Sequence, residues 1–206
     1  MSLNELSIKY HLDKNIHSGC HNYIPGYTQL FEKRKNDIKS MLEIGIGSIE
    51  NGQMGGVIQH GYKTGNSLKC WSEYFPNAII YGMDIYNHAE LNTDRIITFQ
   101  ADQNKYSDLD NVIKNIPVDL DIIIDDGSHC GEHQVFSFMY LNKCLSETGM
   151  YVIEDIQPQH INQFLDLSIF PKDYIKYIKD NFTIEYFDTR NDFGREDDFM
   201  MCFTRK

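Results

Sequence analysis

The stretch Leu120-Asp-Ile-Ile-Ile-Asp-Asp-Gly-Ser-His129 decides how this chain is interpreted. A short and almost continuous apolar run ends on two carboxylates, and a histidine follows three residues after the second one. Apolar runs of this length are typical of parallel strands that are buried on both faces of a sheet. The polar residues directly after such a strand lie at its carboxyl end, where open α/β folds bind their ligands.

Other apolar runs of strand length occur along the chain, and we expect strands at residues 40–45, 78–84, 95–100, 120–125 and 149–154. Amphipathic patterns predict helices at residues 27–38, 67–74, 106–115 and 132–145. Near the end of the sequence, two runs flank a polar loop and predict an antiparallel hairpin of residues 182–187 and 198–203. This alternation predicts an α/β fold, a doubly wound, mostly parallel seven-stranded sheet of the Rossmann-like kind.

The length of 206 residues suits one domain, so we expect residues 1–206 to form a single unit. Within it, residues 1–39 are expected to form helices or a lid at the N-terminus, and residues 40–206 the core of the α/β sheet. Hydrophobic residues make up 41% and charged residues 24%, as in ordinary globular proteins. The net charge of −11 disfavours nucleic-acid binding, because an acidic surface repels phosphates.

No apolar stretch approaches the ~20 residues that span a bilayer, and no leader is recognisable, so we expect a cytoplasmic protein that does not contact membranes. The five cysteines are scattered and contain no C-x-x-C pair, which argues against a disulfide framework and against a zinc site. A homo-oligomer is left open, since no exposed apolar stripe is recognisable in the sequence.

A glycine turn, Glu43-Ile-Gly-Ile-Gly47, follows the first expected strand, and Asp84 ends the second. Such a turn allows close approach of a ligand, and an acid in this place can hold the hydroxyls of a ribose. However, Asp84 comes 37 residues after Gly47, because a glycine-rich loop over residues 48–65 delays the next helix until about Asn66. A pyrophosphate needs a helix directly after the turn, so the spacing disfavours NAD and favours S-adenosylmethionine.

Asp126 and the pair Glu154-Asp155 end neighbouring strands in this arrangement. Three converging carboxylates repel each other unless a cation binds, and oxygen ligands indicate Mg²⁺, or else Mn²⁺ or Ca²⁺. The plainer alternative is that Asp126 caps the following helix while the other two acids are solvated. His129 is placed to accept the proton of a hydroxyl that is being methylated. The alternative for His129 is a surface or packing role.

Several motifs together resemble the macrocin and mycinamicin type of sugar O-methyltransferase. They are Leu42-Glu-Ile-Gly-Ile-Gly47, Gly65-Asn-Ser-Leu68, Ile80-Tyr-Gly-Met-Asp-Ile85, Ile122-Ile-Ile-Asp-Asp-Gly-Ser-His129 and Tyr151-Val-Ile-Glu-Asp155. The similarity runs from about Lys9 to Ile156. Asp-Asp-Gly-Ser-His together with Val-Ile-Glu-Asp is its most specific part, whereas the glycine turn alone is not specific.

This resemblance implies a class I methyltransferase fold that uses S-adenosylmethionine and depends on Mg²⁺. It implies that the metal-binding acids are Asp126, Glu154 and Asp155, and that the general base is His129. The expected cofactor contacts are Glu43, Gly45, Gly47, Ser67, Asp84, Asp102, Gln103 and Asp125. An N-terminal signature of the family resembles Lys9-Tyr-His-Leu-Asp-Lys14 with His21, Tyr23 and Tyr27, except that His11-Leu12 stands where Gly-Thr is usual.

The substrate cannot be transferred from the macrolide-modifying members, because they carry a large extra N-terminal domain. We expect a hydroxyl of a sugar, a sugar nucleotide or a glycan instead. Two alternatives stay open: a metal-dependent methyltransferase of a phenol or catechol, and a non-catalytic nucleoside-binding protein of this fold. Some relatives carry a cephalosporin-hydroxylase label, but an iron oxygenase usually needs two histidines with a carboxylate, and only His129 accompanies the acids here.

Overall fold

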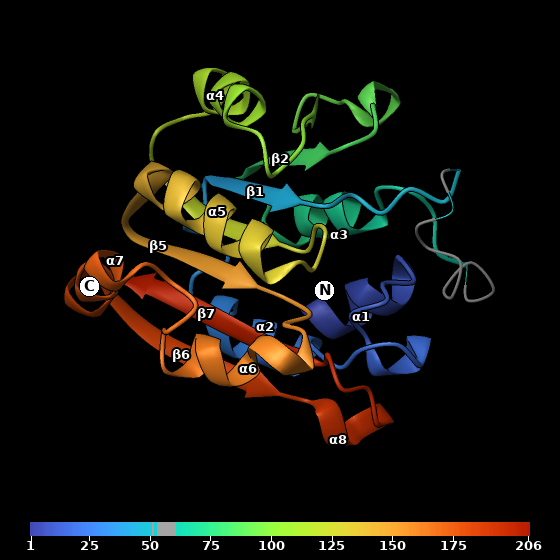
Figure 1. Cartoon of the computed structure of the whole chain (residues 1–206). Helices are drawn as coiled ribbons and strands as arrows, with labels where there is room; N and C mark the ends of the chain where they lie inside the picture. The colour runs from blue at the N-terminus through green and yellow to red at the C-terminus, as the bar shows by residue number, and fades with distance from the viewer. Residues whose placement is uncertain (51, 53–60) are drawn as a thin grey trace.

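A computed structural model describes residues 1–50, 52 and 61–206. In these residues seven strands form one sheet in the order β3-β2-β1-β4-β5-β7-β6 (Figure 1). The strands are β1 (Ser40–Ile44), β2 (Ile79–Asp84), β3 (Ile96–Gln100), β4 (Leu120–Asp125), β5 (Leu145–Ile153), β6 (Phe182–Asp188) and β7 (Phe199–Arg205). The first five run parallel, and β7 lies antiparallel between β5 and β6. This is the doubly wound, mostly parallel sheet with a C-terminal hairpin that the sequence predicts.

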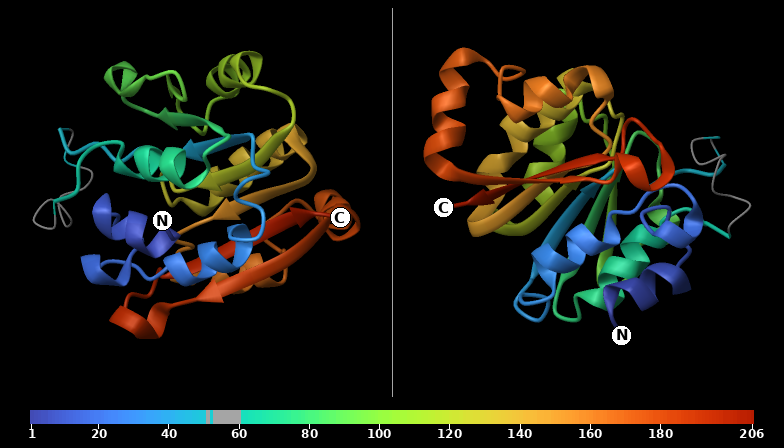
Figure 2. Two further views of the ribbon diagram at one scale, coloured as in Figure 1. Left: turned by 180° about the vertical axis from the view of Figure 1, so that it is seen from behind. Right: turned by 90° about the horizontal axis from the view of Figure 1, so that it is seen from below.

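Helices cover both faces of the sheet (Figure 2). One face packs against α4 (Tyr106–Asn115), α5 (Gly131–Leu141), α6 (Pro158–Leu165) and α7 (Lys172–Asn181). The other packs against α1 (Leu3–Lys9), α2 (Ile24–Phe31) and α3 (Asn66–Tyr74). The short elements are α8 (Arg190–Phe193) and the 3₁₀ turns η1 (Ile16–Ser18), η3 (Ala89–Leu91) and η4 (Asn142–Cys144).

The strands alternate between these two cores, as the two-residue period of a strand requires. In β4, Ile123 enters the core under α5, whereas Ile122 and Ile124 enter the core under α1 to α3. In β5, Tyr151 and Ile153 face the first core. Residues of this kind are fully buried on both sides, which explains the nearly continuous apolar runs in the sequence.

The expected strands and most expected helices are confirmed within a few residues, but two boundaries are wrong. The helix expected at 27–38 spans Ile24–Phe31, because Pro25 occupies its first turn, where proline is favoured, and residues beyond 32 form tight turns. The helix expected at 132–145 ends at Leu141 and continues as a 3₁₀ turn into β5, which begins at Leu145 rather than near Gly149. The expected glycine-rich loop over 48–65 lies largely outside the described residues.

The N-terminal helices belong to the same packed structure as the sheet. Leu3 and Leu6 of α1, and Tyr27 and Phe31 of α2, are buried in the core that covers β1, β4 and β5. Ser2 and Glu5 form a reciprocal capping box that starts α1. The expected boundary at residue 39 therefore separates the first helices from the first strand, and both sides of it share one core. The assignment of residues 1–206 to a single domain stays a prediction.

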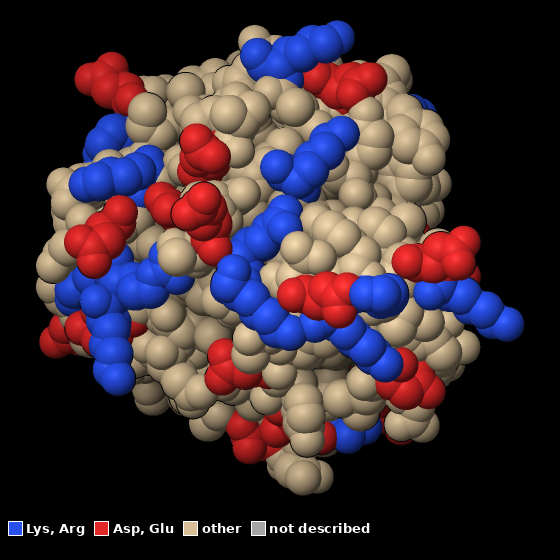
Figure 3. Space-filling model, turned by 90° about the vertical axis from the view of Figure 1, so that its left-hand side faces the viewer, with Lys and Arg blue, Asp and Glu red and all other residues tan. Residues whose placement is uncertain are grey.

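None of the described helices is long and apolar enough to cross a bilayer. Figure 3 shows the face beyond the amino ends of the parallel strands, at the left of Figure 1. On this face Lys and Arg side chains lie interspersed with Asp and Glu. The buried charged groups lie instead at the opposite, carboxyl ends of the strands.

Candidate active site

A cavity of about 650 Å³ opens at the carboxyl ends of the parallel strands. It lies where the strand order reverses between β1 and β4, which is the usual place for a ligand in such a sheet. Its wall includes nine of the residues expected from the sequence: Gly45, Gly47, Ser67, Asp84, Asp102, Gln103, Asp126, His129 and Asp155. Glu43, Asp125 and Glu154 lie behind this wall, so their expected contacts with ligands stay predictions.

The glycine turn after β1 is shaped by its neighbour strand. Gly45 has φ 89°, and a Cβ there would collide with the carbonyl oxygen of Asp126. A hydrogen bond keeps the backbones of Gly45 and Asp126 this close, because the Asp126 amide donates to the Ile44 carbonyl at 2.9 Å. Only glycine allows both the left-handed backbone and this contact. The turn thus joins the cofactor side of the cavity to the loop that carries Asp126 and His129.

Glu43 supports the wall from behind. Its buried carboxylate accepts hydrogen bonds from Ser67 Oγ at 2.6 Å and from Trp71 Nε1 at 3.1 Å. Burial raises its pKa to about 7. These two bonds fix the first turns of α3 against β1, so Glu43 positions Ser67 at the cavity.

Asp84 ends β2 and lines the cavity. Its two oxygens accept the backbone amides of Ile46 at 2.9 Å and Tyr86 at 3.0 Å. Each carboxylate oxygen has a second lone pair, so a ribose hydroxyl can still be bound. The amide of Ile46 belongs to the glycine turn. Its hydrogen bond to Asp84 therefore connects the glycine turn to Asp84, the two features that are expected to contact the cofactor.

Gln103 holds the loop between β4 and α5. Its Nε2 donates to Asp125 at 3.1 Å, and its Oε1 accepts the Ser128 amide at 2.7 Å. Burial raises the pKa of Asp125 to about 6, and hydrogen bonds from Ser137 and Tyr151 oppose that rise. Asp125 is thus a buried anchor for the loop that carries Asp126 to His129.

The acid cluster, defined here as Asp126, Glu154 and Asp155, follows β4 and β5. Possible ligand atoms of Asp126, His129 and Asp155 all lie within 4.8 Å of one another. His129 Nε2 lies 3.2 Å from Asp126, and its Nδ1 lies 3.5 Å from Asp155. His129 and Asp155 have left-handed backbones, with φ 55° and 50°. Such strained residues concentrate at functional sites, because only a constrained surrounding maintains them.

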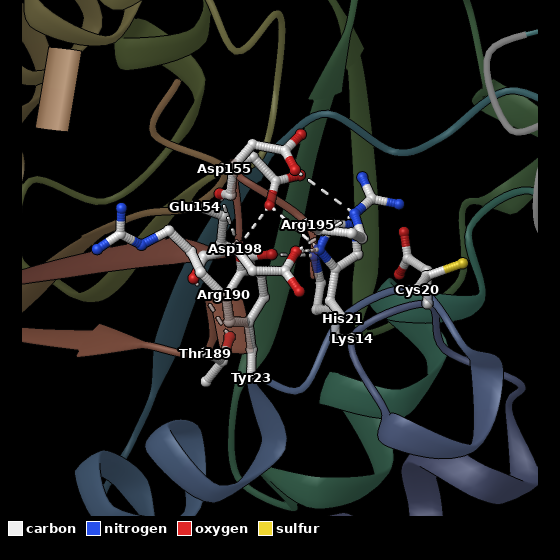
Figure 4. A network of polar contacts seen from close by, with 12 residues as sticks. Lys14, Cys20, His21, Tyr23, Glu154, Asp155, Thr189, Arg190, Arg195 and Asp198 are labelled. Atoms are coloured by element: carbon white, nitrogen blue, oxygen red, sulfur yellow. Dashed lines mark hydrogen bonds and ion pairs between the residues drawn. The ribbon is translucent and has the colours of Figure 1, made fainter. Parts of the chain in front are cut away.

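Residues 13–27, called here the N-terminal segment, supply partners to each acid of the cluster. Figure 4 shows Lys14 and Tyr23 of this segment near Glu154 and Asp155. Tyr23 donates to Asp155 at 2.6 Å, and Tyr27 donates to Glu154. The Lys14 ammonium donates to Glu154 at 2.8 Å and also to Asp126. The segment therefore closes the cavity on the side of the acid cluster.

A second group of ligating side chains adjoins the first. His21 Nδ1 lies 2.6 Å from Asp198 and 3.4 Å from Asp155, and Asp198 is fully buried next to Arg195. The expectation that only His129 accompanies the acids is therefore wrong, because His21 lies beside Asp155 as well. The sequence motifs contain His21 without giving it a role, and nothing in them points to Asp198. Asp198 directly precedes β7, and the antiparallel pairing of β7 with β5 brings it to the same end of the sheet as Asp155.

The electrostatics of the cluster follow from these contacts. Burial alone would raise the pKa of Asp126, but Lys14 and His129 together outweigh burial and hold that pKa well below its usual range. Burial raises the pKa of Glu154, and the same ammonium opposes the rise. Burial lowers the pKa of His129, but its bond to Asp126 and the charge of Asp155 raise it to about 9.

The donors fit the expected ligands. Two carboxylates and an imidazole within 4.8 Å suit a divalent cation, and oxygen donors are what Mg²⁺ prefers. On the other side of the same cavity, Asp84 and the glycine turn suit a nucleoside. Metal and nucleoside would therefore meet next to His129.

Comparison of the sequence with known proteins identifies the family to which the chain belongs. No family model matches the chain. Over 154 residues it is 36% identical to mycinamicin VI 2''-O-methyltransferase of Micromonospora griseorubida and 35% identical to demethylmacrocin O-methyltransferase of Streptomyces fradiae. Its homologues are sugar O-methyltransferases of the macrocin and mycinamicin type. The resemblance noted in the sequence motifs is thus confirmed.

The two macrocin-type matches each cover 75% of this chain, but the chain spans only about a third of those relatives, 36% of each. Among solved structures, the MycE methyltransferase from the mycinamycin pathway, in complex with Mg, SAH and mycinamycin VI, aligns with a TM-score of 0.74 and 27% identity. This alignment covers 100% of the chain and 54% of MycE. The class I methyltransferase fold is therefore confirmed.

Proposed function

We propose that this chain is an S-adenosylmethionine-dependent and Mg²⁺-dependent O-methyltransferase that acts on a sugar hydroxyl. The single observation that carries the proposal is the shared cavity. It joins the glycine turn and Asp84 to Asp126, His129 and Asp155 within one space of about 650 Å³. The macrocin-type homologues and the Mg- and SAH-bound MycE structures support the same chemistry.

His129 is the proposed base. It accepts the proton that the substrate hydroxyl loses as the hydroxyl oxygen bonds to the methyl carbon and the carbon–sulfur bond breaks. While Asp126 and Asp155 are its charged partners, the imidazole is protonated near neutral pH and cannot do this. When bound, S-adenosylmethionine supplies the methyl group, and Mg²⁺ acidifies a hydroxyl and offsets the carboxylate charges that keep His129 protonated.

The other residues position the reactants. Asp84 offers its free lone pairs to the ribose of the nucleoside, and Ser67 and Gly47 form the adjoining wall. Asp126 and Asp155 would hold the ion, and Glu154 would support them from behind with its bonds to Lys14 and Tyr27. The substrate hydroxyl is expected between His129 and the methyl donor.

A sugar nucleotide or a glycan is the substrate class we propose, because the large relatives share only part of their length with this chain. The cytoplasmic location and the lack of nucleic-acid and membrane partners stay predictions from the sequence. Whether the protein forms a homo-oligomer stays open. A phenol or catechol is the alternative acceptor to include in any assay.

The test is a methyl-transfer assay with a panel of sugar nucleotides, free sugars and catechols, in which release of S-adenosylhomocysteine is measured with Mg²⁺ or with a chelator. We expect turnover with a sugar-containing acceptor, abolished by the chelator. Turnover with catechols alone would contradict the substrate class. Binding of S-adenosylhomocysteine without any transfer would favour a non-catalytic protein.

A further inference from the structure

Lys14 is a buried cation inside the acid cluster. Its side chain is only 2% exposed, and its ammonium bonds Asp126 from β4 and Glu154 from β5 (Figure 4 shows Lys14 with Glu154). Its backbone is fixed as well, because the Lys14 carbonyl accepts the amides of Tyr23 at 3.0 Å and Ile24 at 3.3 Å. The ammonium is therefore delivered to the cluster by the folded N-terminal segment.

A buried ammonium is costly unless it is paired, and buried carboxylates are costly for the same reason. Burial raises the pKa of Glu154. However, Glu154 accepts hydrogen bonds on both oxygens, from Lys14 and from Tyr27, and these two donors favour its ionised form against the effect of burial. Asp126 also accepts on both oxygens, from Lys14 and His129. Lys14 thus bridges two ionised acids that would otherwise repel each other.

The charges of the cluster and its partner add up to a simple result. With the three carboxylates ionised and His129 neutral, as its role as the base requires, the acid cluster carries −3, and Lys14 brings this to −2, the charge that one divalent ion neutralises. The nearby charges largely cancel in pairs, because His21 lies against Asp198 and Arg195 lies against Asp197. Without Lys14 the cluster would keep one negative charge in excess.

We propose that Lys14 is a positioning residue, an internal counter-cation that keeps Asp126 and Glu154 together and sets the charge of the cluster to match one divalent ion. This inference rests on the proposed Mg²⁺ dependence. The N-terminal segment therefore takes part in metal binding although it supplies no metal ligand, and Lys14 stabilises the folded protein before an ion arrives.

The test compares the wild-type protein with Lys14→Met, which keeps the length of the side chain and removes its charge. Melting temperature is measured in chelator and in Mg²⁺, and Mg²⁺ affinity is measured by calorimetry. In chelator we expect Lys14→Met to melt well below wild type, because the carboxylates lose their cation. In Mg²⁺ we expect a larger rise in melting temperature than in wild type and about tenfold tighter binding, since a competing positive charge is gone.

Two variants serve as controls. Lys14→Arg keeps the charge and should restore the small response of wild type, and Lys176→Met removes an exposed lysine of α7 and should change nothing. If Lys14→Met does not fold in either condition, the double variant Lys14→Met/Glu154→Gln decides. It returns the cluster to −2, and it should be more stable in chelator than Lys14→Met.

An Mg²⁺ response of Lys14→Met equal to or smaller than that of wild type would overturn the inference, as would a double variant no more stable than the single one. Failure of the proposed function looks different. In that case no acceptor is methylated by wild type or by Lys14→Met, while both proteins still bind Mg²⁺ and Lys14→Met shows the larger rise in melting temperature.

Discussion

The two sides of the cavity differ in where their polar side chains find partners. On the cofactor side, Asp84 is held by backbone amides of Ile46 and Tyr86, and Glu43 is held by the adjacent helix α3. On the side of the acid cluster, each carboxylate is bound by a side chain from the N-terminal segment, more than a hundred residues away. The first side is assembled by neighbouring strands and turns, and the second requires a distant segment to dock.

This difference has a functional consequence. Changes in the N-terminal segment should affect the acid cluster, its metal binding and the protonation of its histidines. They should leave the affinity for S-adenosylhomocysteine largely intact, because no side chain of that segment bonds Asp84 in the described residues. The following variants test whether the two sides are as separate as the contacts indicate.

The largest effect is expected for His129→Ala, which removes the proposed base. Turnover should fall by about 10²- to 10⁴-fold, the usual contribution of a general base, while binding of S-adenosylhomocysteine persists. Steady-state kinetics and calorimetry measure the two quantities. His17→Ala, which removes an exposed histidine of η1, is the matched control. Unchanged turnover in His129→Ala would remove this residue from the mechanism.

Asp84→Ala should act on the other side of the cavity. Loss of a charged hydrogen-bond acceptor costs about 1.5–3 kcal/mol, so the affinity for S-adenosylhomocysteine should fall by roughly 10- to 100-fold. The rise of melting temperature in Mg²⁺ should stay as in wild type. Asp173→Ala, at an exposed position of α7, controls for the loss of an acid. A parallel loss of the Mg²⁺ response would show that the two sides are coupled.

Tyr23→Phe should weaken the acid cluster without touching the cofactor side. It removes the hydroxyl that donates to Asp155 at 2.6 Å and leaves a buried carboxylate short of a partner. We expect a loss of about 2 kcal/mol and a fall of about 4–8 °C in melting temperature. Affinity for S-adenosylhomocysteine should not change. Tyr186→Phe, at a tyrosine that is 58% exposed, should leave the melting temperature as it is.

The pH dependence of stability tests the side of the acid cluster through its histidines. Burial lowers the pKa of His21, but its hydrogen bond to Asp198 and the charge of Asp155 outweigh burial and raise it to about 9. Because the folded pKa is higher than the unfolded value of about 6.5, this stabilisation is complete below pH about 6.5 and is lost as pH rises through about 9. His129 behaves in the same way.

In chelator, the melting temperature of wild type should therefore fall between pH about 6.5 and 9, and the fall should be smaller in His21→Gln. The part due to His21 is on the order of 3 kcal/mol, from a rise in pKa from 6.5 to about 9. His17→Gln, at an exposed histidine, should keep the full pH dependence. An identical pH dependence in wild type and His21→Gln would show that the contact with Asp198 does not keep His21 protonated.

The order and type of the central elements could be predicted from the sequence, because buried parallel strands have a strong local signal. Residues 120–125 are predicted and observed as a strand, and 106–115 as a helix. Helices α6 and α7 were missed, since their amphipathic patterns are short and each starts at or after a proline. The position of α2 was wrong because Pro25 starts the helix earlier than its apolar pattern suggests.

The candidate site could be predicted in part, since polar residues after parallel strands meet at one edge of a sheet. Asp84, Asp126, His129 and Asp155 line the cavity as this argument requires. The argument does not say which polar residues reach the cavity and which stay behind its wall. Glu43 and Glu154 stay behind it, because Trp71 and Lys14 bind them there.

The sequence by itself therefore determined the strands, their buried character and the residues that end them, because these depend on local patterns of apolar and polar side chains. The tertiary structure decided how the charges are balanced. Lys14, His21 and Tyr23 are distant from the acids in the chain, and only docking of the N-terminal segment places them within hydrogen-bonding distance. Electrostatic partners are chosen by distance in space, and the spacing of residues along a sequence does not contain that distance.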